Sequence, residues 1–203
     1  MTNNLKNKNH ILEKEIKKYN YLFENNNLYN ANKNHPRYAI AEKFLKRCGK
    51  VKLVADIGCG RCIFFDMLQE KGLQVFGLEP STVIVNSKKS PFVIQGTCDN
   101  IPFANNLFDV VFCLDVLEHI PGILISDSLK ELHRISNNYL IISAASHEDI
   151  VENLKVHITI KLYPEWEKII SKYFKIVSSE MIYSKTYPGR TAKVYLCRKM
   201  IKK

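Results

Sequence analysis

The chain has 203 residues, of which 46% are hydrophobic and 25% charged, and its formal net charge at pH 7 is +10. This length suits about one domain, and the composition is that of a globular protein rather than a disordered or membrane-spanning one. The longest apolar runs, such as VVFCL and YLII, are far shorter than the ~20 residues that cross a bilayer. The first twenty residues have no sustained apolar core and no small-residue cleavage site, so we expect a cytoplasmic protein.

Much of the positive charge lies near the two ends of the chain, within residues 1–34 and 185–203. No zinc finger, arginine–aromatic stripe or recognisable RNA-binding motif accompanies it, which argues against nucleic acid as a partner. The positive field still favours an anionic substrate or surface.

Six cysteines are scattered along the chain, mostly in apolar strand-like segments, as is typical of small buried side chains rather than of a disulfide framework. Cys59 and Cys62 form a CxxC pair, but no second pair or Cys/His cluster of matching spacing completes a zinc site. We therefore interpret this pair as structural rather than as a metal or redox centre.

Residues 1–34 are rich in asparagine and lysine and predict a mobile start followed by an amphipathic helix over 11–23, which would act as a lid. A second helix is predicted over 37–48, because Pro36 precedes it and Gly49 follows it.

From residue 51 onwards, strand-like and helix-like patterns alternate. The predicted strands are 51–58, 73–79, 92–96, 107–115 and 139–146. The predicted helices are 62–72, 81–89 (with Ser81 as a cap), 125–135 and 164–174. Two further strands, 175–185 and 191–199, flank the turn-rich TYPGR and suggest an antiparallel hairpin. Residues 35–203 therefore predict one α/β domain, doubly wound and Rossmann-like, with a mostly parallel seven-stranded sheet and a C-terminal antiparallel hairpin.

A glycine loop follows the first of these strands. Gly58 and Gly60 allow a tight turn and a close approach of the backbone to a ligand, and Glu79, at the end of the next strand, can accept hydrogen bonds from ribose hydroxyls. A dinucleotide fingerprint would need a third glycine where Ile63 stands, and Asp56 would repel a pyrophosphate. The loop therefore favours a cationic adenosine ligand over a dinucleotide.

Several motifs, in order, resemble those of the class I S-adenosylmethionine-dependent methyltransferases: DIGCG, GLEPS and QGTCDNIPFANNLFDVVFCLDVLEHI. The last resembles the branch that includes ubiquinone-biosynthesis and many small-molecule methyltransferases, and the likeness covers roughly residues 37–199. It implies S-adenosylmethionine as cofactor and S-adenosylhomocysteine as product, with Glu79 on the ribose. The other cofactor-binding residues that it implies are Asp56, Gly58, Cys59, Gly60, Pro80, Thr97, Cys98, Asp99, Leu114 and Asp115.

The sequence departs from the family pattern at three places. Cys62 replaces the usual third loop glycine, and we expect its small side chain to pack against the loop or the ligand. An acidic residue is missing after the QG pair, so adenine would rely on backbone groups of Thr97 and Cys98 and on a hydroxyl or Asp99. Asn137 and Asn138 replace a glycine-rich turn and can adopt the same turn geometry.

His119 is the candidate catalytic residue, as a general base for a hydroxyl acceptor; the alternative is a histidine that orients the loop. If its turn is helical, Asp115, Glu118 and His119 share a face and can bind a divalent metal, and the ubiquinone-type relatives carry a similar pattern linked to metal dependence. The alternative for the two acids is a helix cap and a solvated side chain.

The segment after residue 145 is expected to form part of the acceptor pocket. His119, His147 and His157 are its candidate substrate-binding residues, although His157 is equally consistent with a half-buried strand histidine. Trp166 is interpreted as a packing residue. By analogy of fold, Tyr19, Tyr21 or Tyr29 would touch the methionine end of the cofactor.

The sequence therefore predicts a methyltransferase that acts on a small-molecule acceptor at oxygen, such as a sugar, a quinone precursor or a secondary metabolite. Two alternatives stay open. One is an RNA or protein methyltransferase, which the basic ends favour; a DNA adenine methyltransferase is disfavoured because PPY or PPF is absent after residue 113. The other is a non-catalytic module that keeps the cofactor fold, against which the intact Asp56, Gly58, Gly60 and Glu79 argue. The oligomeric state is left open.

Overall fold

The computed structural model describes residues 2–26, 29, 32–184 and 189–200. Its centre is a seven-stranded sheet in the order β3-β2-β1-β4-β5-β9-β8. The strands are β1 (Leu53–Ile57), β2 (Gln74–Glu79), β3 (Val93–Gln95), β4 (Phe108–Cys113), β5 (Ser136–Ala145), β8 (Phe174–Tyr183) and β9 (Thr191–Lys199). The first five are parallel, and β9 pairs antiparallel with both β5 and β8. The predicted mostly parallel sheet with a C-terminal antiparallel hairpin is confirmed.

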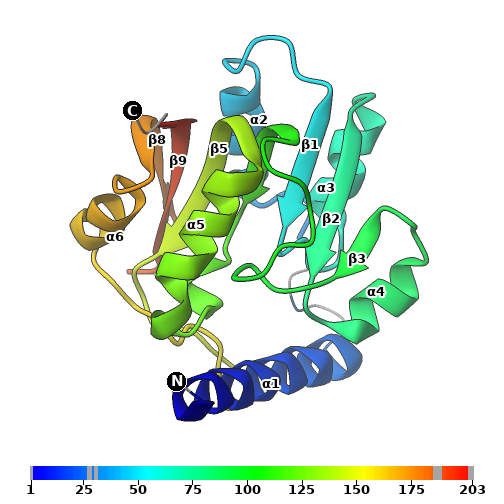
Figure 1. Cartoon of the computed structure of the whole chain (residues 1–203), viewed down its shortest axis with the longest axis vertical. Helices are drawn as coiled ribbons and strands as arrows, with labels where there is room; N and C mark the ends of the chain where they lie inside the picture. Colours follow the sequence, from blue (N-terminus) through cyan, green and yellow to red (C-terminus); the bar gives the residue numbers. More distant parts are fainter. Residues whose placement is uncertain (1, 27–28, 30–31, 185–188, 201–203) are drawn as a thin grey trace.

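Helices cover both faces of the sheet, α2 and α3 on one side and α5 and α6 on the other (Figure 1). The helices are α1 (Thr2–Asn25), α2 (Pro36–Leu45), α3 (Ile63–Glu70), α4 (Thr82–Lys88), α5 (Ile125–Ile135) and α6 (Tyr163–Ile170). Neighbouring strand residues supply the two cores in turn: Val110 packs with the α2–α3 core and Val111 with the α5–α6 core. This explains why the central strands are mainly apolar, since both of their faces are buried.

Two local predictions are wrong. Asn137 and Asn138 lie inside β5 and form no turn, because the chain becomes extended at Ser136 directly after the last residue of α5. The alternative that places His157 in a strand (VHITI, residues 156–160) is also wrong, because a short hairpin of β6 (Ile150–Val151) and β7 (Leu154–Lys155) precedes this segment, which is itself not a strand. Glu152 and Asn153 both have positive φ, as a two-residue hairpin turn requires.

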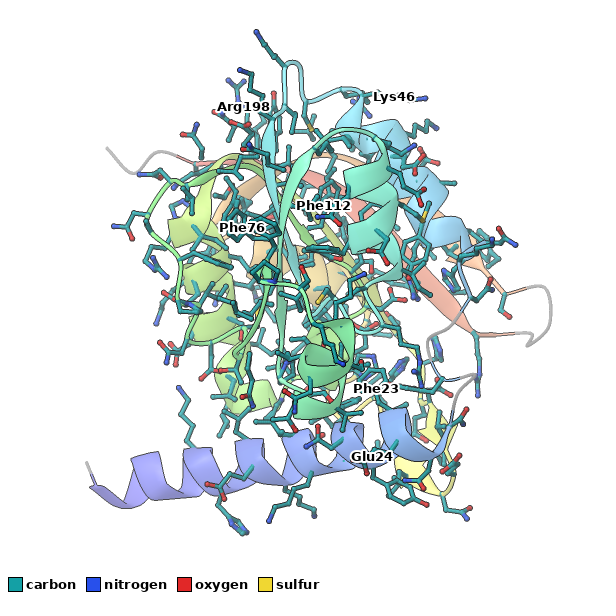
Figure 2. The ribbon with its side chains drawn as sticks, turned by 90° about the vertical axis from the view of Figure 1, so that its right-hand side faces the viewer. Phe23, Glu24, Lys46, Phe76, Phe112 and Arg198 are labelled. Atoms are coloured by element: carbon teal, nitrogen blue, oxygen red, sulfur yellow. The ribbon has the colours of Figure 1, made fainter. Side chains whose placement is uncertain are left out.

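The N-terminal helix α1 lies across the carboxyl ends of the parallel strands (Figure 1). It begins at Thr2, although the sequence predicts a mobile start there. Figure 2 shows Phe23 on the side of α1 that faces the domain and Glu24 on the opposite side, and Phe23 is correspondingly buried. The side chain of Asn20 contacts Thr82 of α4 (3.2 Å) and accepts a hydrogen bond from the Ser81 hydroxyl (2.7 Å). Ser81 therefore stands at the start of α4 without capping it.

Within the part of the chain that the structure describes, no helix is long and apolar enough to cross a membrane.

Candidate active site

A cavity of about 780 Å³ lies at the carboxyl ends of β1, β2 and β4, beneath α1. The strand order reverses at β1, and a doubly wound sheet binds its ligands at this point. Eleven of the predicted site residues line this one cavity: Gly58, Gly60, Glu79, Pro80, Thr97, Cys98, Asp99, Asp115, His119, His147 and His157. Residues far apart in the sequence therefore meet in one place.

The loop after β1 needs glycine at position 58. Gly58 has φ +74, its N–H donates to the carbonyl of Leu78 (2.7 Å), and a Cβ atom there would lie 2.5 Å from Cγ2 of Val116. Both the backbone conformation and the contact with Val116 exclude a larger residue. The loop therefore keeps backbone rather than side chains at the cavity wall.

Glu79 is held by the loop and by its own strand end. Its Oε2 accepts a hydrogen bond from the N–H of Gly60 (2.8 Å), and its Oε1 accepts one from the N–H of Ser81 (3.0 Å). Burial raises the pKa of Glu79 to about 7, while these two hydrogen bonds act to lower it. Each carboxylate oxygen keeps a further lone pair, so this side chain can accept hydrogen bonds from two neighbouring ligand hydroxyls.

Asp56, Cys59 and Leu114 do not line the cavity. Asp56 is buried, and a backbone hydrogen bond at Phe65 and the charge of Arg37 act on it; burial nevertheless raises its pKa to about 7. Its carboxylate therefore supports the start of α3 behind the loop, and its contact with the cofactor stays a prediction.

The two sulfur atoms of the CxxC pair lie 3.6 Å apart, and both cysteines are buried free thiols. Cys62 has φ +60, the left-handed conformation that glycine adopts readily, and its Sγ lies 3.5 Å from the carbonyl oxygen of Gly60. Cys62 therefore packs against the loop, as the sequence predicts.

Asp115 is bound by Arg37, a residue that carries no sequence motif and that we did not predict. The Arg37 guanidinium forms an ion pair with one carboxylate oxygen, and the Ser143 hydroxyl binds the other. Burial alone would raise the pKa of Asp115, but the charges of Arg37 and His35 and the Ser143 hydrogen bond outweigh it and lower the pKa to about 2. Asp115 is therefore ionised, and the positive charge of Arg37 balances its negative charge.

His119 lies in a short 3₁₀ turn, η1 (Leu117–His119). Its Nδ1 is 2.9 Å from the carbonyl oxygen of Val156 and 2.8 Å from the hydroxyl of Tyr19. A carbonyl oxygen can only accept, so Nδ1 carries the proton and Nε2 keeps a lone pair. Burial, followed by the neighbouring His157, lowers the pKa of His119 to about 3. The ring is therefore neutral.

The three predicted substrate-binding histidines lie in a row. The ring centroid of His157 is 4.9 Å from that of His119 and 4.9 Å from that of His147. Nδ1 of His157 donates to the carbonyl of His147 (2.7 Å), and Nδ1 of His147 donates to the carbonyl of Thr191 (3.0 Å). Burial lowers the pKa of both His119 and His157, so these two rings present an unprotonated Nε2.

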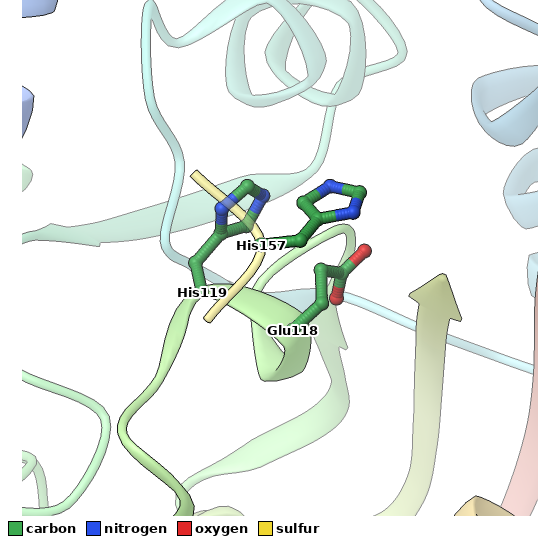
Figure 3. A group of neighbouring side chains, drawn as sticks. All are labelled: Glu118, His119 and His157. Atoms are coloured by element: carbon green, nitrogen blue, oxygen red, sulfur yellow. The ribbon is translucent and has the colours of Figure 1, made fainter. Parts of the chain in front are cut away.

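The helical face that would combine Asp115, Glu118 and His119 does not form. Asp115 has φ +53 and lies outside η1, where Arg37 binds it. Glu118 is not solvated, as the alternative would have it, but 1% exposed. Burial, followed by the charge of Asp115, raises its pKa to about 8. Figure 3 shows that Glu118 and His119 lie instead beside His157.

The aromatic residues divide between the cavity and the core. Tyr19 and Tyr29 line the cavity, whereas Tyr21 does not and is 48% exposed, so of the three alternatives Tyr19 and Tyr29 stay as candidates. Trp166 is completely buried and donates from Nε1 to the carbonyl of Ala145 (3.2 Å), which confirms a packing role.

Residues 55–139 match a protein-family model described as a methyltransferase domain. Over this segment the chain is similar to a methyltransferase domain. Over 88 residues it is 36% identical to a ubiquinone biosynthesis O-methyltransferase of Serratia proteamaculans (strain 568). That match covers 38% of this chain, and the chain spans only 36% of the length of that relative.

Two solved structures of low sequence identity share the fold of this domain. One is the 1,6-didemethyltoxoflavin-N1-methyltransferase of Burkholderia thailandensis with bound 1,6-didemethyltoxoflavin and S-adenosylhomocysteine (TM-score 0.75, 15% identity, 92% of this chain and 87% of that chain). The other is a [4+2]-cyclase (TM-score 0.63, 14% identity, 81% of each chain). The second shows that proteins with this fold bear names other than methyltransferase, so the fold alone does not assign an activity.

Proposed function

We propose that this protein is an S-adenosylmethionine-dependent methyltransferase that methylates a small molecule at a hydroxyl oxygen. The observation that carries the proposal is Glu79, whose carboxylate is fixed between the N–H groups of Gly60 and Ser81 at the mouth of the glycine loop. A carboxylate held in this way suits the two hydroxyls of a ribose. Thr97, Cys98 and Asp99 line the cavity beyond it and would surround the adenine.

S-adenosylmethionine would supply a methyl group already activated by its sulfonium charge and would leave as S-adenosylhomocysteine. The protein's task is then to align the acceptor and to exclude water. The helix α1 supports this role, because Tyr19 and Phe23 from it line the cavity. A roof of this kind suits an acceptor small enough to be enclosed, which favours a small molecule over RNA or a protein.

Without a bound metal ion, His119 would accept a hydrogen bond from the acceptor hydroxyl at Nε2. Since burial lowers the pKa of His119 to about 3, the ring is a weak base and orients the hydroxyl more than it removes its proton. A phenolic hydroxyl, which loses its proton more easily than that of a sugar, suits such a base. Among the predicted acceptors, this favours a quinone precursor, and the O-methyltransferase relative supports the same choice.

Calorimetric titration with S-adenosylhomocysteine, with NAD as the negative ligand, tests the cofactor. We expect binding of the first and none of the second. Glu79→Gln should weaken S-adenosylhomocysteine binding at least tenfold (about 1.4 kcal/mol), because an amide cannot accept from both backbone N–H groups. Glu70→Gln is the matched control, since Glu70 is exposed on α3. Absence of binding, or equal affinities of the two variants, would refute the cofactor assignment.

Transfer of a labelled methyl group to a panel of phenols, sugars and total RNA tests the acceptor. We expect label on a phenol. Label on RNA alone would replace the small-molecule proposal with the RNA methyltransferase alternative. Cofactor binding without transfer to any member of the panel would favour the non-catalytic module.

A further inference from the structure

Three buried or half-buried side chains on the acceptor side of the cavity offer metal-ligating atoms to one point. They are Glu118 and His119 of η1 and His157 of the segment after β7 (Figure 3). One ligand atom from each residue lies within 4.8 Å of the ligand atoms of the other two. We propose that Glu118, His119 and His157 bind one divalent transition-metal ion.

The protons of both imidazoles are placed as a metal site requires. Nδ1 of His119 donates to the carbonyl of Val156 (2.9 Å), and Nδ1 of His157 donates to the carbonyl of His147 (2.7 Å). Histidines that bind metals usually donate their second ring N–H to a carbonyl or carboxylate, which sets the tautomer and the ring orientation. Both rings therefore present Nε2 as a ligand.

Glu118 supplies an oxygen that the protein itself does not satisfy. Its Oε1 accepts a hydrogen bond from the N–H of Ala145 (3.1 Å), whereas its Oε2 is buried and has no hydrogen-bond partner. A buried carboxylate oxygen without a partner is costly, and a bound cation would offset that cost. Glu118 Oε2 is thus the third ligand.

Backbone hydrogen bonds hold the two parts of the site together. The carbonyl of Glu118 accepts from the N–H groups of both Ile158 (2.9 Å) and Thr159 (3.0 Å), and the Thr159 hydroxyl donates to the carbonyl of Ile120 (2.6 Å). The segment that carries His157 is therefore fastened against η1, although the two are nearly forty residues apart in the sequence. Because ligands of one ion lie roughly 3–4 Å apart at metal–ligand distances of about 2.0–2.2 Å, only small side-chain movements are needed to close the set.

The ligand types select the metal. Two imidazoles and one carboxylate suit zinc, iron, cobalt or nickel, whereas magnesium and calcium prefer oxygen ligands. Asp115, the acid that the sequence pattern would add, does not belong to the set, because Arg37 and Ser143 bind its two oxygens. Three protein ligands leave a coordination position open for water or an acceptor heteroatom on the cavity side.

Cobalt titration of chelator-treated protein, followed by visible absorption, tests this site directly. We expect one equivalent of Co²⁺ to bind with a spectrum of nitrogen and oxygen ligands, and zinc but not excess magnesium to displace it. His157→Ala and Glu118→Gln should each weaken binding at least tenfold. His147→Ala should not, since the His147 ring lies outside the group and the carbonyl that binds His157 is retained. Asp115→Asn should also retain cobalt binding.

Failure of the wild-type protein to bind cobalt, or equal binding by wild type and His157→Ala, would overturn the proposal. So would a sulfur-to-cobalt absorption band that disappears in Cys59→Ser, because it would place the metal on the CxxC pair. S-adenosylhomocysteine binding, measured on the same samples, reports that each variant is folded. Since the metal site does not rest on the proposed methyl transfer, loss of one binding reaction leaves the other standing.

Discussion

The hydroxyl of Tyr19 lies 2.8 Å from Nδ1 of His119, a residue 100 positions further along the chain. The same hydroxyl donates to the carbonyl of Val156 (3.2 Å), which also accepts from His119. One tyrosine of α1 thus joins the turn after β4 to the segment after β7. The N-terminal helix is therefore a wall of the candidate active site, and its contribution can be measured at this side chain.

Tyr19→Phe removes the hydroxyl and keeps the ring. We expect the free energy of unfolding to fall by about 1 kcal/mol, because the Val156 carbonyl loses one of its two donors in a buried place. Urea denaturation of wild type and variant measures it. Tyr21→Phe is the control, since Tyr21 is on the same helix and 48% exposed. Equal stabilities of the two variants would show that the Tyr19 hydroxyl contributes no stability through its contacts with Val156 and His119.

The second prediction compares Gly58 of the glycine loop with Gly49, which precedes β1. Both glycines have the same left-handed backbone conformation, but their surroundings differ. Gly58 (φ +74) would place a Cβ atom 2.5 Å from Cγ2 of Val116, whereas Gly49 (φ +77) has nothing within 4 Å. Alanine at either position pays for a left-handed conformation, about 1–2 kcal/mol. Gly58→Ala should lose clearly more stability than Gly49→Ala, as measured by thermal unfolding.

The excess loss in Gly58→Ala should shrink when Val116 is also replaced by alanine. That rescue identifies the cause as the contact between the new Cβ atom and Val116. If Gly58→Ala and Gly49→Ala lose the same stability, the loop has room for a side chain, and the close approach of its backbone to Val116 is not what requires glycine.

Local pattern was enough to predict most of the fold and the glycine-loop side of the candidate site. Hydrophobic runs and glycine punctuation located every strand of the large sheet, and Gly58, Gly60 and Glu79 were found because their roles depend on positions relative to strand ends. Asn137 was predicted to form a turn because asparagine is common in turns. Its residue type could not indicate that α5 passes directly into β5. Such a join depends on the packing of α5 and β5.

The polar contacts of the acceptor side could not be predicted, because they join distant segments. Arg37 reaches Asp115 across 78 positions, and His157 reaches Glu118 through a segment with no regular structure. The sequence pattern placed Asp115, Glu118 and His119 on one helical face, but a 3₁₀ turn and the positive φ of Asp115 separate them. The local sequence pattern around Asp115 does not indicate that α2 supplies a positive charge beside it.

The Arg37–Asp115 ion pair provides the third prediction. Arg37→Met should lower the free energy of unfolding by roughly 2–3 kcal/mol, somewhat less than the loss of one partner of a fully buried pair, because the Asp115 side chain is 21% exposed. Asp115→Asn combined with Arg37→Met should recover part of the loss, since the unpaired charge is then gone. A double-mutant cycle by urea denaturation measures the coupling, and additive effects of the two changes would mean that the pair contributes none.

The dependence of stability on pH provides the last prediction. Burial raises the pKa of Glu118 to about 8 and those of Glu79 and Asp56 to about 7, so the folded protein retains protons that the unfolded chain releases. Stability from these groups is complete at low pH and is lost as pH rises through the folded values. His119, with its pKa lowered to about 3, acts in the opposite direction but only below about pH 6.5.

Between about pH 6.5 and 8, the three carboxyl groups therefore act without His119, and the metal-free protein should lose stability as pH rises. Glu118 alone should contribute about 1–2 kcal/mol of that loss, at ~1.4 kcal/mol per pKa unit. Glu118→Gln should flatten the profile above pH 7, whereas Glu70→Gln, an exposed acid, should leave it unchanged. Urea denaturation in chelator-containing buffers at several pH values measures both slopes. A wild-type profile that is level over this interval would mean that the buried carboxyl groups are already ionised at its lower end. In that case Glu118 is stable as a carboxylate without a bound cation or a hydrogen bond from a ligand.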